Sequence, residues 1–93
     1  MVLLISYDLN GHERPSAYAA IKSAIETKSI SRIRPLYSQW FVTTNDSPAT
    51  WANYLKSSRV VDGNDRLFIT RVTSGYQGWL TKEDWAWLNS QVL

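Results

Sequence analysis

The chain begins with the apolar run Val2-Leu3-Leu4-Ile5-Ser6-Tyr7, which leads directly into Asp8-Leu9-Asn10-Gly11. A continuous apolar run of this length is typical of a strand buried on both faces of a sheet. The Asn-Gly pair ends the run because it readily supplies the positive φ of a turn. We therefore predict a central strand over Val2–Tyr7 that delivers Asp8 to its end.

Two helices are predicted further along the chain. Pro15 suits the first turn of a helix, where its missing N–H has no partner to lose. An apolar stripe at helical spacing follows it: Ala17, Ala20, Ile21, Ala24 and Ile25. The first helix is therefore expected from Pro15 to about Thr27. The second is expected from Pro48 to about Ser58, because Ser47 is a favoured N-cap and Pro48 fits the first helical position.

Two further strands and a third helix complete the expected elements. Lys28–Pro35 is expected to be a polar connection, and Leu36–Thr43 a strand whose successive side chains point to opposite faces. Arg66–Val72 is expected to be the last strand of the sheet. Tyr76–Leu80 is expected to be a short edge strand or an ordered loop. Thr81-Lys82-Glu83-Asp84 resembles a capping box, which predicts a final short helix.

This order of elements predicts the fold class. Strands joined through helices favour right-handed crossovers with the helices on one face, and a split βαβ arrangement achieves this with few strands. We expect one α+β domain over residues 1–93, with a ferredoxin-like sheet and an aromatic-rich C-terminal tail ending in a short helix. A small doubly wound sheet is the alternative, which is disfavoured because two helices cover both of its faces poorly.

Composition narrows the classes of function. The chain has 93 residues, no cysteine, five tryptophans and five tyrosines. The absence of cysteine excludes a disulfide framework, a thiolate metal site and a cysteine nucleophile. So many large rings in a small domain suggest an interface, and we expect a homodimer, with a protein partner at the tryptophan-rich tail as a further possibility. No apolar run is long enough to span a membrane, so we expect a cytoplasmic protein that does not enter one.

The charge distribution is compatible with nucleic acid. The formal net charge is +2. Lys22, Lys28, Arg32 and Arg34 lie in a short stretch that contains a single acid, Glu26. Such a cluster either binds a phosphate backbone or forms an ordinary solvated face.

Asp8 is the main candidate for chemistry. A carboxylate at the end of a buried strand can bind Mg²⁺, with Mn²⁺ as the alternative, and a two-fold dimer would bring two copies together. The alternative is that Asp8 hydrogen-bonds its own turn. His12, the single histidine, is a candidate general base or simply a solvated loop residue. Arg14 is a candidate phosphate contact or a partner of a nearby acid.

Ser38-Gln39-Trp40 combines polar and aromatic residues inside the expected strand Leu36–Thr43. Ser38 either lines a nucleic-acid pocket or satisfies buried backbone groups. Trp40 offers a stacking surface, but core packing is the favoured explanation for it. Phosphate loops, dinucleotide fingerprints, nucleophile elbows and metal-ligand histidine pairs are absent from the sequence.

Two families resemble the chain over roughly Val2 to Val72. The strand that ends in Tyr7-Asp8-Leu9 resembles the start of the small CRISPR-associated proteins that partner the spacer-acquisition integrase, here named Cas-two. The VapD toxins are similar and share the ferredoxin-like fold. Ser16–Ile21 and Tyr37–Val42 resemble the first helix and second strand of both families. Gly75–Leu93 departs from the pattern, which suggests a stand-alone relative.

The resemblance implies a homodimer with Asp8 of each protomer across a cleft, and divalent-metal-dependent phosphodiester cleavage. In spacer acquisition such proteins act mainly as dimeric scaffolds that hold DNA. Our first hypothesis is therefore a metal-dependent nuclease, acting on RNA, with Asp8 and His12 as its catalytic residues. The second is a non-catalytic dimer that grips nucleic acid through Lys28, Arg32 and Arg34. The third is a protein-interaction scaffold that uses the aromatic tail.

Overall fold

The computed structural model describes residues 1–9 and 15–92. They form a four-stranded sheet in the order β2-β3-β1-β4, in which neighbouring strands are antiparallel. The strands are β1 (Val2–Asp8), β2 (Ser31–Leu36), β3 (Gln39–Thr43) and β4 (Arg66–Val72). The helices are α1 (Pro15–Lys28), α2 (Pro48–Ser57) and α3 (Lys82–Gln91).

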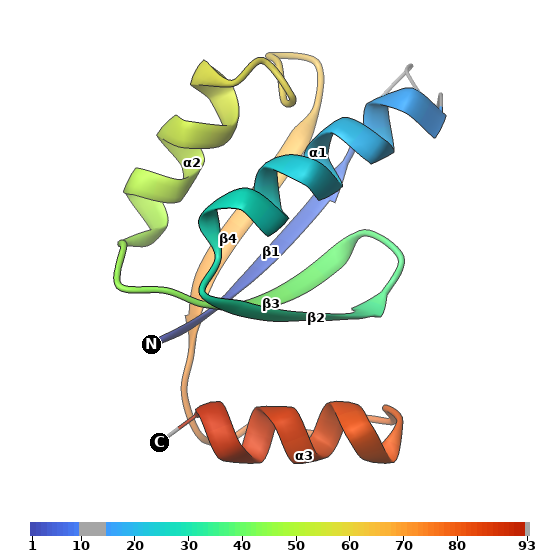
Figure 1. Cartoon of the computed structure of the whole chain (residues 1–93), viewed down its shortest axis with the longest axis vertical. Helices are drawn as coiled ribbons and strands as arrows, with labels where there is room; N and C mark the ends of the chain where they lie inside the picture. Colours follow the sequence, from blue (N-terminus) through green and yellow to red (C-terminus); the bar gives the residue numbers. More distant parts are fainter. Residues whose placement is uncertain (10–14, 93) are drawn as a thin grey trace.

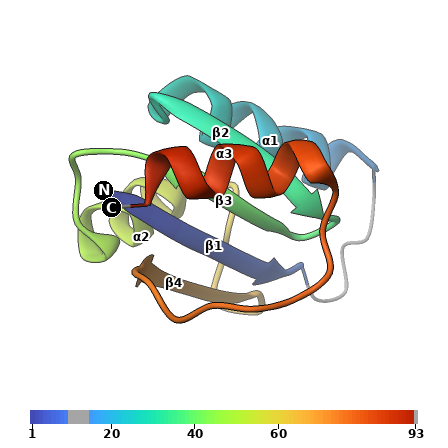
Figure 2. The same cartoon turned by 90° about the horizontal axis from the view of Figure 1, so that it is seen from below.

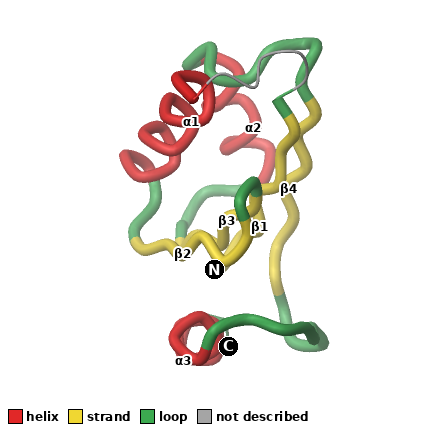
Figure 3. The backbone as a smooth tube through the Cα atoms, turned by 90° about the vertical axis from the view of Figure 1, so that its right-hand side faces the viewer, coloured by secondary structure: helices red, strands yellow, loops and turns green. Residues whose placement is uncertain are grey.

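The connections confirm the predicted ferredoxin-like α+β fold. Helix α1 joins β1 to β2 and α2 joins β3 to β4, so each helix crosses over one intervening strand. Both crossover helices cover the same face of the sheet, whereas α3 lies against the opposite face (Figure 1 and Figure 3). Strand β1 is central, as predicted, because it pairs with β3 on one side and with β4 on the other.

The segment between α1 and α2 corrects the prediction. The expected connection Lys28–Pro35 contains all but the last residue of the edge strand β2. The expected strand Leu36–Thr43 is divided by the turn Tyr37-Ser38, which closes a hairpin. Ser38 therefore lies in the turn and not inside a strand. The sequence does not predict this hairpin, because the turn lacks the glycine or asparagine of most tight hairpins. Pro35 also argues against a strand, yet an edge strand tolerates it.

Both predicted helix caps are present. The side-chain oxygen of Ser47 accepts a hydrogen bond from the backbone N–H of Thr50 at 3.1 Å. That of Thr81 accepts from the backbone N–H of Asp84, also at 3.1 Å. Each cap satisfies one of the N–H groups that the start of a helix leaves unpaired. Helices α2 and α3 therefore begin where the sequence predicts.

The main core fills the space between the sheet and the helices α1 and α2. Its buried members include Leu3, Ile5, Tyr7, Ile21, Ile25, Trp40, Val42, Trp51 and Leu55. Trp51 is fully buried, and its indole Nε1 donates to the Thr44 hydroxyl at 3.0 Å. The same hydroxyl accepts from the backbone N–H of Asp46 at 3.1 Å. These bonds matter because a buried donor without a partner destabilises the fold.

Helix α3 covers only part of the second face. Leu88 is buried, the Trp87 indole Nε1 donates to the Ser31 hydroxyl at 2.9 Å, and the Thr43 hydroxyl donates to Gln91 Oε1 at 2.9 Å. These contacts place α3 over β2 and β3 (Figure 2). On the β4 side of this face, Phe68 is 64% exposed.

Candidate functional site at the Asp8 end of the sheet

The end of β1 lies beside the β2–β3 turn. The backbone N–H of Tyr7 donates to the carbonyl of Ser38 at 3.1 Å. Asp8 pairs with Arg66, the first residue of β4. Successive strand side chains point to opposite faces, so Tyr7 points toward the α1 and α2 layer and Asp8 toward the side of α3. This end of the sheet therefore carries two candidate surfaces, one on each face.

We name the two surfaces by their residues. The tyrosine surface, on the α1 side, consists of Tyr7, Tyr18, Arg34, Tyr37 and Trp40. The Asp8 surface, on the α3 side, consists of Ser6, Asp8, Arg66 and Phe68.

A bulge in β2 shapes the tyrosine surface. The pairing shifts register between Ile33 and Leu36, so that Arg34 and Pro35 together lie opposite Trp40. A bulge bends its strand and re-aims the side chains. Here the Arg34 guanidinium lies 5.2 Å from the centroid of the Trp40 ring. An edge-strand arginine is thereby held against a buried indole.

The turn holds Arg34 from a second direction. Its Nε donates to the Tyr37 carbonyl at 2.7 Å, and its guanidinium lies 4.7 Å from the centroid of the Tyr37 ring. Within the described part of the chain, no acidic side chain forms an ion pair with Arg34. Its terminal nitrogens make no hydrogen bond to the described residues and keep donors that a phosphate oxygen can accept, while the ring contacts restrict the side chain.

Three tyrosine rings connect the core to the surface here. The ring centroids of Tyr7 and Tyr18 are 6.1 Å apart, and those of Tyr18 and Tyr37 are 5.2 Å apart. Tyr7 is buried, and its hydroxyl accepts from the Trp40 indole Nε1 at 3.0 Å. Burial raises the pKa of Tyr7, against the opposing effects of this hydrogen bond and of the Arg34 charge. Tyr37, at the outer end, is 67% exposed.

The Asp8 surface borders an open hollow of about 320 Å³. Its lining residues are Ser6, Tyr7, Asp8, Arg66, Leu67 and Phe68. Asp8 and Arg66 are exposed and face each other across neighbouring strands, but they are not within ion-pair distance. Phe68 is 64% exposed beside them. The surface therefore combines both signs of charge with an exposed aromatic ring.

The described residues of one chain do not fit a magnesium site. Mg²⁺ is held by oxygen ligands and is usually bound by one or two carboxylates together with phosphate oxygens and water. Asp8 supplies one carboxylate, and no group of three or more acidic or histidine side chains that could hold a metal occurs among residues 1–9 and 15–92. The neighbour across the strand is the cation Arg66, which disfavours a second cation.

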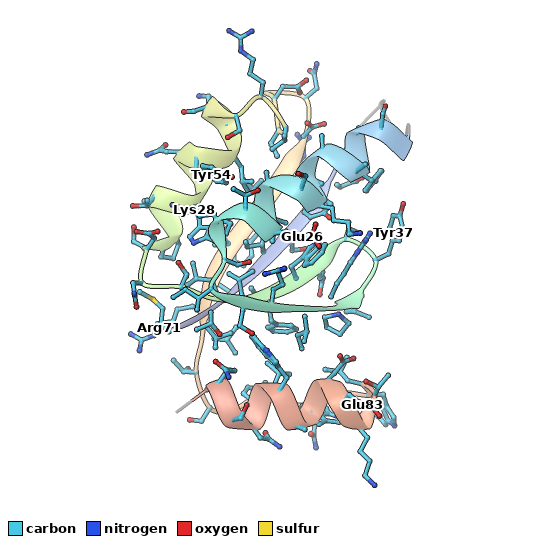
Figure 4. The ribbon with its side chains drawn as sticks, in the orientation of Figure 1. Glu26, Lys28, Tyr37, Tyr54, Arg71 and Glu83 are labelled. Carbon is cyan, nitrogen blue, oxygen red and sulfur yellow. The ribbon has the colours of Figure 1, made fainter. Side chains whose placement is uncertain are left out.

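Lys28 lies away from this end of the sheet. Its Nζ is 3.0 Å from Asp46 Oδ2 and 5.1 Å from the centroid of the Tyr54 ring. Figure 4 shows Lys28 beside Tyr54, whereas Tyr37 lies on the opposite side of the view. The length of β1, about 20 Å for seven residues, separates Lys28 from Asp8. Lys28 is therefore engaged within the fold, and the structure does not bring it together with Asp8.

The other predicted site residues are placed as follows. Arg32 lies two residues before Arg34 in β2, with Nη1 3.5 Å from the Ser29 hydroxyl. Ser38 lies in the turn, and its carbonyl accepts from the Tyr7 N–H. His12 and Arg14 lie outside the described residues.

The sequence did not single out Tyr37 or Tyr18 as site residues, and it did not place Arg66 beside Asp8. Two features could not be read from the sequence. One is the bulged hairpin, which brings Tyr37 and Arg34 together. The other is the register between β1 and β4, which pairs Asp8 with Arg66. The predicted final helix does bury Leu88, on the face of the sheet opposite to the main core, whereas Trp79 is 96% exposed.

The comparisons with known proteins assign no family. No protein-family model matches the chain, and a search of curated proteins finds no significant relative. The similarity to the Cas-two and VapD families thus stays an expectation drawn from short motifs. No helix of the described residues is both long and apolar enough to cross a membrane. The chain forms a ferredoxin-like α+β domain with two candidate functional surfaces at one end of its sheet.

Proposed function

We propose that the protein is a homodimeric nucleic-acid-binding protein, with Arg34 as the main phosphate contact. The observation that carries this proposal is the arrangement of Arg34. It combines contacts to two aromatic rings, a hydrogen bond to the turn and terminal donors that form no ion pair with the described residues. Arginine in such a setting is suited to phosphate, because its planar donors are already oriented.

The surrounding charge supports the same function. Arg32 precedes Arg34 on β2, and the formal net charge of the chain is +2. Nucleic acid carries a dense row of phosphates, so even a few oriented cations give salt-sensitive binding. Lys28 is not part of this proposal, since Asp46 pairs with it.

A second copy of the chain is the partner that the Asp8 surface favours. In a two-fold interface the same patch meets itself. Asp8 and Arg66 carry opposite charges on neighbouring strands. A two-fold axis through this surface would let Asp8 of one protomer pair with Arg66 of the other. Phe68, 64% exposed, supplies apolar area for such a contact.

The dimer is tested by mass measurement with light scattering after gel filtration. We expect the wild type to elute with the mass of a dimer and Phe68→Glu with that of a monomer. Trp79→Glu is the matched control, because it places the same charge on another exposed ring and should leave the dimer intact. A monomeric wild type would contradict the dimer.

Binding is tested by fluorescence anisotropy with labelled RNA and DNA over a series of salt concentrations. Arg34→Gln should weaken binding about tenfold and reduce the slope of log affinity against log salt by about one phosphate contact. Arg34→Lys retains the charge, so its affinity should lie between those of the wild type and Arg34→Gln. Binding by no nucleic acid at any salt concentration would rule out the proposed function.

A metal-dependent nuclease is a second candidate, favoured by the exposed Asp8 carboxylate beside an open hollow. This function requires ligands beyond those of the described residues of one chain, such as a second Asp8 in the dimer. The test compares cleavage of labelled RNA and DNA by the wild type and Asp8→Asn with Mg²⁺, Mn²⁺ or EDTA. Cleavage that survives Asp8→Asn would remove Asp8 from the chemistry.

A further inference from the structure

We infer that the tyrosine surface binds single-stranded nucleic acid, with one unpaired base stacked on the ring of Tyr37 while Arg34 holds an adjoining phosphate. This inference rests on the proposed nucleic-acid binding and adds the class of nucleic acid and the residue that recognises it.

The position of Tyr37 leaves its ring accessible to a ligand. It lies at the tip of the β2–β3 hairpin and is 67% exposed. Among the described residues its hydroxyl makes no hydrogen bond, whereas the buried Tyr7 hydroxyl accepts one from Trp40. The exposed ring therefore contributes little to the core. An aromatic ring that projects beside a fixed cation has the composition of a base-stacking platform.

The Tyr37 ring is held in position by neighbouring side chains. Tyr37 contacts the Arg34 guanidinium, 4.7 Å from its centroid, and the Tyr18 ring, 5.2 Å from its centroid. Tyr18 in turn contacts Tyr7, whose hydroxyl is bonded to Trp40. A ring that is already oriented loses little conformational freedom when a base stacks on it, which strengthens binding.

The geometry of the surface selects single strands. Stacking on Tyr37 requires a base whose flat face is accessible, and bases inside a duplex are covered by their neighbours. The neighbouring cations can guide the backbone away from the hairpin tip. Arg32 lies two residues before Arg34 in β2, and Lys22 lies one helical turn after Tyr18 in α1. Sequence readout is not required, because every base offers a face to the ring.

The test measures the affinity of short labelled oligonucleotides by anisotropy. Tyr37→Ala should weaken binding of single-stranded RNA or DNA about tenfold, as expected for the loss of one stacked base. Tyr37→Phe keeps the ring and should bind within about twofold of the wild type. Trp79→Ala removes an even more exposed ring elsewhere and should leave the affinity unchanged. Thermal melting confirms that each variant is folded.

A second arm tests stacking itself. In a series of oligonucleotides with one abasic position, one member should lose affinity for the wild type but not for Tyr37→Ala. Parallel RNA and DNA series show whether the 2′-hydroxyl contributes.

Two results overturn the inference. If Tyr37→Ala binds single strands as well as the wild type does, or if duplexes bind more tightly than single strands, the stacking role is wrong while nucleic-acid binding stands. If the wild type binds no nucleic acid, the proposed function and the inference both fail.

Discussion

The guanidinium of Arg34 lies 4.7 Å from the centroid of the Tyr37 ring and donates from Nε to the Tyr37 carbonyl at 2.7 Å. One arginine is thus bound to the backbone and to the side chain of the same turn residue. The pair lies beside the end of β1, because the Tyr7 N–H bonds the carbonyl of Ser38, the next residue of that turn. The architecture therefore places an oriented cation and an exposed ring next to the strand that carries Asp8.

Tyr7 predicts a dependence of stability on alkaline pH. Burial raises its pKa above the ordinary value of 10.0. The unfolded chain therefore releases the Tyr7 proton at a lower pH than the folded chain does. The stability contributed by the neutral hydroxyl is fully present below about pH 10 and is lost as the pH rises through the folded pKa.

Tyr7→Phe isolates this effect. At neutral pH the variant should be less stable by about 1–3 kcal/mol, because the buried Trp40 indole loses its acceptor. The difference in the free energy of unfolding between wild type and variant should shrink above about pH 10. Urea unfolding from about pH 8 to pH 11 measures it. A difference that stays constant or grows over this range would contradict the assignment.

Thr44 predicts a matched pair of stability effects. Its hydroxyl accepts from the Trp51 indole and from the backbone N–H of Asp46. Thr44→Val keeps the shape but leaves the buried indole donor without its partner, at a cost of about 1–3 kcal/mol. Thr44→Ser keeps the hydroxyl and should cost less than Thr44→Val. Urea unfolding distinguishes them, and a more stable Thr44→Val would show that these bonds are unimportant.

Helix α3 should be separable from the main core. Leu88 is 1% exposed, and Leu88→Ala should cost about 2–4 kcal/mol by leaving a cavity under α3. Because α1 and α2 lie on the other face, hydrogen exchange should accelerate in α3 much more than in β1. Equal acceleration in both elements would show that α3 unfolds only together with the whole domain.

Much of the fold follows from local sequence signals. The strand Arg66–Val72 coincides with β4, and Ser47 and Thr81 cap the helices that they were predicted to cap. These features were predictable because caps, turns and apolar runs act over a few residues. The hairpin was not, because Pro35 resembles a strand breaker and the turn Tyr37-Ser38 lacks the glycine or asparagine of most tight hairpins.

The candidate site was less predictable for the same reason. Asp8 was found because a polar residue ends a conspicuous apolar strand. Tyr37 was not singled out, since its exposure depends on a turn that sequence spacing does not reveal. Lys28 resembled Arg32 and Arg34 in the sequence, yet its pairing with Asp46 depends on tertiary structure.

Lys28 is expected to contribute to the stability of the fold and not to nucleic-acid binding. Lys28→Met removes the charge and keeps an unbranched side chain against Trp51 and Tyr54. We expect a loss of stability of at most about 1 kcal/mol, because the pair with Asp46 is partly exposed. Affinity for nucleic acid should remain within about twofold of the wild type. A tenfold loss would mean that the binding surface extends to this end of the sheet.

The most direct test of nucleic-acid binding at the tyrosine surface is a titration of isotope-labelled protein with a short single-stranded RNA, followed by NMR. The largest chemical-shift changes should occur at the Tyr37 and Ser38 amides, the Arg34 side-chain Nε–H and the Trp40 indole N–H. Shifts confined to α3 or to the surroundings of Lys28, or no shifts at all, would contradict the proposed site.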